Sequence, residues 1–282
     1  MSNLLLKSVC SAMKRIAPPR LAEKWDNVGL LLESPVPAQG RKVLLTIDLT
    51  SAVLAESVST GASVIVAYHP TIFQGIKSIT LSNPLQASLL QCAAQGISVY
   101  SPHTSLDFVW GGINDWLAEG LMNGKGNGQI TSLLGEVQTQ DNEGGQGRLV
   151  TLNEATGIDV LEQRIKSHLK LSQIQVGYPQ GRARPALVRT IAICAGSGGS
   201  MLAGQDADVY FTGEMQHHEV LAAVGAGKHV ILCGHTNTER GYLPVLALKL
   251  QEELSGKEYV EQGLGGVEIL VSQKDQHPLK FV

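Results

Sequence analysis

Three histidines of this chain follow short apolar runs, and two of them precede a carboxylate by four residues. His69 has no such partner, whereas His103 is paired with Asp107 and His235 with Glu239. Open α/β sheets place their ligand sites at the carboxyl ends of strands, which is where these side chains would lie. Imidazole and carboxylate together suit zinc, manganese, iron or magnesium, so the sequence predicts a divalent-metal site.

Two of these motifs also have a structural explanation. A lone histidine such as His69 is more often structural than metal-binding, and Asp107 could cap the helix that Gly111-Gly112 precede. If residues 235–239 open a helix, their spacing puts both side chains on one face, as helical metal-binding pairs require. The metal prediction therefore depends on the three groups occurring together, each at a strand end.

Two further segments carry polar groups next to apolar runs. Glu214 is followed by His217 and His218, which as neighbours on a helix point in different directions and cannot easily share one ion. These three side chains would line the site or support its ligands, with an exposed helix face as the alternative. Residues 195–200 (AGSGGS) could bind phosphate or carboxylate through backbone N–H groups, although a tight strand-to-helix turn explains them equally well.

The apolar runs that position these groups are short and end in glycine, proline or polar residues, as buried parallel strands do. Plausible helices lie at 50–60, 84–95 and 215–226, so the order is mostly βαβ and the expected class is α/β. The six predicted strands are Val43–Ile47, Ala62–Ala67, Ile97–Tyr100, Val188–Cys194, Ala207–Phe211 and His229–Cys233.

Glycine-, asparagine- and glutamine-rich segments at 123–129 and 138–147 indicate a lobe boundary near the middle of the chain. We expect a first α/β lobe at 1–126 and a second at 127–282. The last helix and strand, from residue 240 or so to the end, could pack back on the first lobe.

Composition restricts the class of protein. The chain has 282 residues, 43% of them hydrophobic, and a net charge of −3, which argues against general attraction to nucleic acid or anionic membranes. Its four cysteines are far apart and form no C-x-x-C pair, which argues against a thiolate zinc site and favours a reducing compartment. We expect a cytoplasmic location, with a nuclear one left open. Residues 3–17 favour an amphipathic helix over a mitochondrial targeting segment.

Taken in order, the motifs resemble those of the NGG-interacting factor three-like family, also named GTP cyclohydrolase I type 2 homologues. The similarity extends over most of the chain. Its motifs are Trp25-Asp26-Asn27-Val28-Gly29-Leu30, Ile47-Asp48-Leu49-Thr50, Tyr68-His69-Pro70, His103-Thr104 to Asp107, Cys194 to Gly198, Thr212-Gly213-Glu214 and Gly234-His235 to Glu239.

The resemblance implies two similar lobes, with mainly parallel or mixed sheets flanked by helices and a dinuclear metal site between them. It implies that one or two divalent ions are bound by His69, Asp107, His235 and Glu239, and that the protein forms a dimer or hexamer. Bacterial members carry two adjacent histidines where this chain has Tyr68-His69, the eukaryotic-type pattern. A phenol is a poor ligand at neutral pH, so a second ion would bind weakly, rely on His103 or be absent.

Three classes of function are compatible with such a site. The first is a metal-dependent hydrolase, cyclohydrolase-like or a phosphoesterase, that acts on a small phosphorylated or nucleotide-like substrate while His103 or Glu214 moves protons. The second is a non-enzymatic adaptor or regulator that binds other proteins and is stabilised by the ions. The third is a metal carrier or storage protein.

Overall fold

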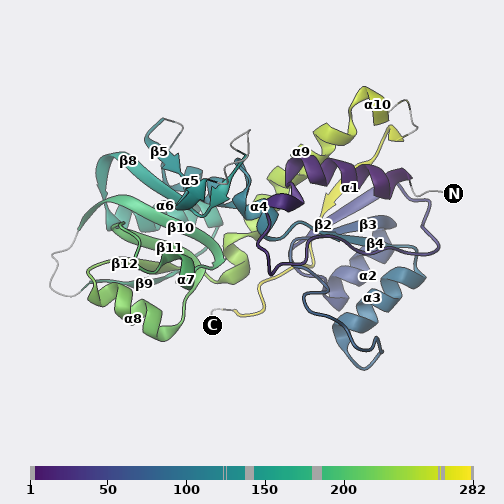
Figure 1. Cartoon of the computed structure of the whole chain (residues 1–282), viewed down its shortest axis with the longest axis horizontal. Coiled ribbons are helices and arrows are strands. Elements are labelled where there is room, and N and C mark those ends of the chain that lie inside the picture. The colour runs from purple at the N-terminus through teal and green to yellow at the C-terminus, as the bar shows by residue number, and fades with distance from the viewer. Residues whose placement is uncertain are drawn as a thin grey trace. The chain divides into compact units, whose positions relative to one another are not determined.

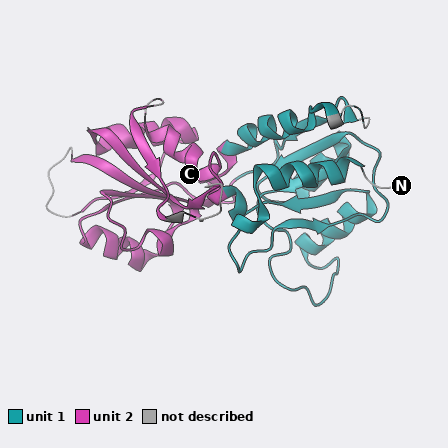
Figure 2. Ribbon diagram, turned by 45° about the horizontal axis from the view of Figure 1, so that its top comes forward, with its two compact units in different colours: residues 1–106, 242–276 teal, residues 107–241, 277–282 magenta. Residues whose placement is uncertain are grey.

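The computed structural model describes residues 4–280 except 123, 125, 137–142, 180–185, 260, 262 and 263. The chain divides into two units, each built on its own sheet (Figure 2). Unit 1 comprises the residues up to 106 and 242–276, and unit 2 comprises 107–241 and the residues from 277 onward. The sequence placed the lobe boundary at 126/127, whereas the chain leaves unit 1 at 106 and returns to it at 242.

Unit 1 contains a five-stranded sheet in the order β1-β4-β3-β2-β13. The strands β2 (Lys42–Thr46), β3 (Ala62–Ala67), β4 (Ser98–Ser101) and β13 (Glu268–Val271) are parallel, and β1 (Gly29–Leu32) pairs antiparallel with β4. Every residue of β3 is buried, so both faces of the sheet are covered, as its continuous apolar run predicts.

Helices cover both faces of this sheet (Figure 1). On one face α1 (Leu4–Ile16) packs with α9 (Leu243–Leu254), and on the other α2 (Ser51–Thr60) packs with α3 (Pro84–Ala94). The predicted amphipathic helix is confirmed in α1, whose buried residues recur at helical spacing. The shorter helical segments of this part of the chain are η1 (Pro19–Leu21), α4 (Thr104–Phe108), which continues into unit 2, and α10 (Lys257–Tyr259).

Unit 2 contains a six-stranded mixed sheet in the order β5-β8-β10-β11-β12-β9. Its three central strands, β10, β11 and β12, are parallel, and the flanking strands pair antiparallel. The strands are β5 (Gly128–Thr131), β8 (Arg148–Gly157), β9 (Gln175–Gly177), β10 (Leu187–Ser197), β11 (Val209–Glu214) and β12 (His229–Leu232).

Helices also cover both faces of the unit 2 sheet (Figure 1). On one face lie α5 (Ile113–Leu121) and α6 (Ile158–Leu169), and on the other α7 (Gly199–Leu202) and α8 (His217–Gly225). The remaining described elements are the β6 (Leu134–Glu136) and β7 (Gly145–Gln146) pair and the 3-10 turns η2 (His235–Thr238) and η3 (Arg240–Tyr242). The predicted class, α/β with two lobes of parallel or mixed sheets flanked by helices, is confirmed.

Residues 235–238 form a 3-10 turn, so the α-helix on which the one-face argument for His235 and Glu239 depended does not begin here. Side chains compete for the backbone groups that an α-helix would use. Asn237 Nδ2 donates to the carbonyl of Cys233, and Thr238 Oγ1 donates to the carbonyl of His235. Such local hydrogen bonds favour turns over helix interiors.

Candidate functional site

In unit 1, the carboxyl ends of β2, β3 and β4 bring together Asp48, His69 and His103 at one edge of the sheet, because the three strands are parallel. Backbone hydrogen bonds continue past the strand ends: His69 N donates to Ile47 O at 3.0 Å, and His103 N donates to Tyr68 O at 3.2 Å. The prediction that these histidines follow strands is therefore confirmed.

Each of the two histidines is oriented by a carboxylate at Nδ1. His69 Nδ1 lies 2.9 Å from Asp48 Oδ1, and His103 Nδ1 lies 2.7 Å from Asp26 Oδ1. An ionised carboxylate only accepts, so each Nδ1 donates, and in the neutral form of each ring the lone pair is on Nε2. This carboxylate–imidazole arrangement is the one that fixes metal-binding histidines in proteins.

Asp26 is suited to this role because it stays ionised although its side chain is fully buried. Burial raises the pKa of Asp26, but hydrogen bonds from His103 and from the side chain and backbone N–H of Thr104 outweigh it and leave the pKa below its usual value. His103 itself has a φ of 33°, a conformation that costs free energy in residues other than glycine. The surrounding hydrogen bonds therefore hold the backbone of His103 in a strained conformation.

In unit 2, the ends of β11 and β12 bring together Glu214, His235 and Glu239. His235 Nδ1 lies 2.8 Å from Glu214 Oε1, and its Nε2 lies 3.3 Å from Oε1 of Glu239, whose side chain is 1% exposed. When Nδ1 donates to Glu214, the Nε2 lone pair faces a carboxylate oxygen, and two acceptors at this distance repel unless a cation or a proton lies with them. The donor set of imidazole nitrogen and carboxylate oxygen suits a borderline or hard divalent ion.

Gly196 lets this pair approach β10. Its φ is +64°, and a Cβ there would lie 2.7 Å from Glu239 Oε1 and 3.0 Å from His235 Nε2. Its N–H donates to Thr238 Oγ1 at 2.9 Å, which ties η2 to the end of β10. Only glycine combines this backbone conformation with this space.

Asp107 lies in the same unit, and its backbone is fixed to β10 through Asn114. Asn114 Nδ2 donates to Asp107 O at 3.1 Å, and Asn114 Oδ1 accepts from Ala195 N at 2.9 Å. The pKa of the Cys194 thiol is raised by burial first and then by the charges of Asp107 and Glu239. Unit 2 thus collects three of the four predicted ligands, while His69 belongs to unit 1.

Of the two explanations left open for the glycine loop at 195–200, the structure favours the tight turn over an anion site. The N–H groups of Gly196 and Gly198 already donate within the chain, to Thr238 Oγ1 and Glu214 O. The carboxylate of Glu219 lies against Gly199 and would repel an anion. Since α7 is a single turn, the tight strand-to-helix connection is the explanation that the structure supports.

Several contributing residues were not assigned a role from the sequence. Asp26 and Asp48 were noted only as parts of motifs, and Asn114 was not singled out as a ligand support. The position of Asp48 in the sequence could have suggested a role, because Asp48 follows β2 as His69 follows β3. His277, whose Nδ1 lies 2.9 Å from Thr236 Oγ1, carried none. His217 and His218 lie exposed at the start of α8, which matches the exposed-face alternative.

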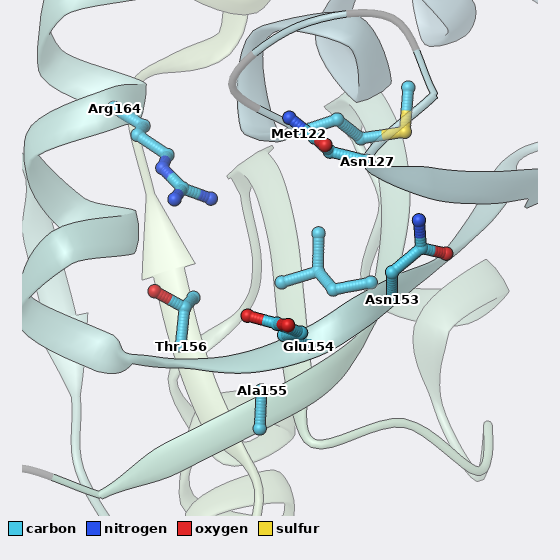
Figure 3. Close-up of a pocket in the computed structure, with 8 residues that line it drawn as sticks. Met122, Asn127, Asn153, Glu154, Ala155, Thr156 and Arg164 are labelled. Carbon is cyan, nitrogen blue, oxygen red and sulfur yellow. The ribbon is translucent and has the colours of Figure 1, made fainter.

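A separate pocket of about 400 Å³ lies in unit 2 (Figure 3). Glu154 and Thr156 of β8 and Arg164 of α6 line it. Among the described residues that line this pocket there is none of the predicted ligands, so it is not the predicted site.

Within the described part of the chain, no helix is long and apolar enough to cross a membrane.

Comparisons with known proteins cover nearly the whole chain. The model of a family described as Duf34/NIF3 (NGG1p interacting factor 3) matches residues 4–278. The chain is 46% identical to the protein NIF3 homolog of Schizosaccharomyces pombe, over 96% of this chain and 98% of that protein. It is 36% identical to NGG1-interacting factor 3 of Saccharomyces cerevisiae, over 97% and 96%. The crystal structure of a Bacillus cereus protein related to NIF3 shares the fold, with a TM-score of 0.80 at 21% identity over 98% of each chain.

Proposed function

The chain belongs to the Duf34/NIF3 (NGG1p interacting factor 3) family, and from that premise we propose that it is a metal-dependent hydrolase acting on a small phosphorylated or nucleotide-like substrate. The proposed ligands are Asp107, His235 and Glu239, which all belong to unit 2, while His69 of unit 1 stays a prediction from the sequence. The observation that carries the proposal is the position of the His235 imidazole between two carboxylates, one of them almost fully buried.

Zinc, manganese, iron or magnesium would suit this donor set. When bound, such an ion supplies a Lewis acid that polarises a carbonyl or phosphoryl oxygen and makes a nearby water more acidic. We propose that one ion is held strongly. A second should bind weakly or not at all, because Tyr68, whose ring lies 5.5 Å from that of His103, offers a phenol in place of a second imidazole.

The chain's own residues divide into two roles in this proposal. Glu214 fixes the ring of His235 through Nδ1, so it is a positioning residue, although the sequence suggested proton transfer for it. His103 is the proposed proton-transfer group, because Asp26 holds its Nδ1–H and leaves Nε2 as the nitrogen that takes up or releases a proton.

The test combines metal analysis with turnover. The metal content of the purified protein is measured, and release of product is followed on phosphoesters, nucleotides and cyclic amides, for wild type and His235→Ala. The matched control is His217→Ala, which removes an exposed histidine from the same unit. We expect His235→Ala alone to lose both metal and turnover. If His235→Ala lost its metal but the wild type turned over none of the compounds, the hydrolase would be rejected.

A second candidate is a metal-binding adaptor without catalytic activity. It is favoured by the name of the Saccharomyces cerevisiae relative, NGG1-interacting factor 3. A complex with a partner protein that forms in the wild type and dissociates when a chelator removes the ion would support it. A complex that persists after the ion is removed would reject a metal-responsive adaptor.

A further inference from the structure

Two large aromatic side chains of unit 1 are exposed beside His103. Trp25 is 59% exposed and Phe73 is 49% exposed, and their ring centroids lie 5.8 Å apart. Both also contact the imidazole of His103, with centroids at 6.0 Å and 6.3 Å. Single exposed apolar residues need no explanation, but adjacent exposed aromatic rings at a candidate site indicate a binding surface.

Hydrogen bonds fix the backbone beneath both rings. Asp26, next to Trp25, accepts from His103 Nδ1 and from the backbone N–H of Thr104. Asn27 Nδ2 donates to the carbonyl of Ile72, next to Phe73. Hydrogen bonds thus restrain the residues next to both rings, which lowers the entropy lost when a ligand binds.

The angles between the rings restrict what can bind. The planes of Trp25 and Phe73 meet at 62°, and those of Trp25 and His103 at 73°. A flat ligand ring cannot lie parallel to two of these rings at once. It can stack on the face of Trp25 and present its edge to Phe73, which is the offset and edge-to-face geometry that aromatic pairs prefer.

We propose that Trp25 and Phe73 form a stacking platform for a planar heteroaromatic ring of the substrate, of the nucleobase type. This inference rests on the proposed function, because contact of both rings with His103 places the stacked ring next to the proposed proton-transfer group. It specifies the substrate as a compound that joins a flat ring to a hydrolysable group. Stacking tolerates purines and pyrimidines alike, since every base has a π-face.

The test uses pairs of ligands that differ in the ring alone. Binding of the 5′-monophosphates of adenosine, guanosine and uridine is compared with that of ribose 5-phosphate, by calorimetry on the protein with its bound metal. The variants are Trp25→Leu, Phe73→Leu and Trp25→Phe. The matched control is Leu248→Ala, which removes a 73% exposed apolar side chain from α9 of the same unit.

We expect wild type and Leu248→Ala to bind at least one nucleotide about tenfold more tightly than ribose 5-phosphate. Trp25→Leu and Phe73→Leu should lose most of this preference and keep their metal content, and Trp25→Phe should retain part of it. Equal binding of all four ligands by wild type would reject the platform. If neither leucine variant weakened the preference, the ring would bind elsewhere and the platform would also be rejected.

The same samples separate the platform from the hydrolase. Turnover of ribose 5-phosphate without any ring preference would support the hydrolase and reject the platform. A ring preference without turnover of any compound would support the platform and reject the hydrolase. If Trp25→Leu altered the mass of the protein in sedimentation and wild type showed no ring preference, the aromatic pair would be a contact between copies of this chain.

Discussion

Arg148 and Asp115 form a buried, two-pronged ion pair in unit 2. Arg148 Nε donates to Asp115 Oδ1 at 2.9 Å, and Nη2 donates to Oδ2 at 2.6 Å. The same guanidinium donates to the carbonyls of Phe108 and Val109, the residues that follow Asp107. The pair therefore holds the segment from which a proposed ligand projects.

Arg148→Met should destabilise unit 2 by about 3–5 kcal/mol, because it leaves a buried carboxylate without its counter-ion. Urea unfolding followed by circular dichroism measures this. The control is Glu268→Ala, which breaks the exposed pair of Lys42 and Glu268 and should cost less than about 1 kcal/mol. A similar small loss in both variants would show that the buried pair contributes little.

Gly196→Ala should weaken metal binding by about tenfold or more, because the added Cβ would displace Glu239 or His235. The matched control is Gly204→Ala. Gly204 also has a positive φ, +77°, but a Cβ there meets nothing within 4 Å. Both variants should lose about 1 kcal/mol of stability through backbone strain. Competition with a chromogenic chelator measures the affinity, and an equal affinity in both variants would contradict the proposed ligand pair.

Glu214→Ala should lower metal affinity by about 10–100-fold without abolishing it, because the ligand nitrogen of His235 remains but its ring is no longer oriented. Glu214→Gln should fall in between, since an amide oxygen can still accept from Nδ1. Glu154→Gln, an exposed carboxylate of the same unit, serves as the control. If Glu214→Ala bound the metal as tightly as the wild type does, contacts other than Glu214 would orient the ring of His235.

Asp208 gives a pH-dependent prediction. Burial raises its pKa, but hydrogen bonds from the N–H groups of Arg189 and Thr190 and from Thr190 Oγ1 outweigh it and leave the pKa lowered. A lowered pKa stabilises the fold above the unfolded value of about 3.9, and this stability is lost as pH falls through the folded pKa. Asp208→Asn should therefore cost about 1–2 kcal/mol at pH 7, and its difference from wild type should shrink below about pH 4.

Unfolding of both proteins between pH 7 and pH 3 measures this difference. Asp206→Asn is the control. Asp206 is fully exposed, and its carboxylate forms only a surface ion pair, 3.6 Å from Lys228 Nζ, so its charge should contribute little to stability. A difference between wild type and Asp208→Asn that stayed constant down to pH 3 would contradict the role given to the Asp208 carboxylate.

The strands that precede His69, His103 and His235 could be predicted because each is a short apolar run closed by a polar residue. The orientation of the three imidazole rings could not be predicted. The partner of His103, Asp26, lies in a segment with neither helical nor strand periodicity, and the 3-10 turn at 235–238 depends on side-chain hydrogen bonds that spacing does not reveal. The sequence left two explanations open for the glycines at 196 and 198, because a tight turn and an anion site share one sequence pattern.

The return of the chain to unit 1 at residue 242 has a consequence for synthesis on the ribosome. β13 pairs with β2, so β2 lacks its outer neighbour until residues 268–271 have emerged. By then every strand of the unit 2 sheet has already been made. Unit 2 can therefore fold while unit 1 still presents the unpaired backbone of β2, a strand edge open to pairing with other chains and to chaperones.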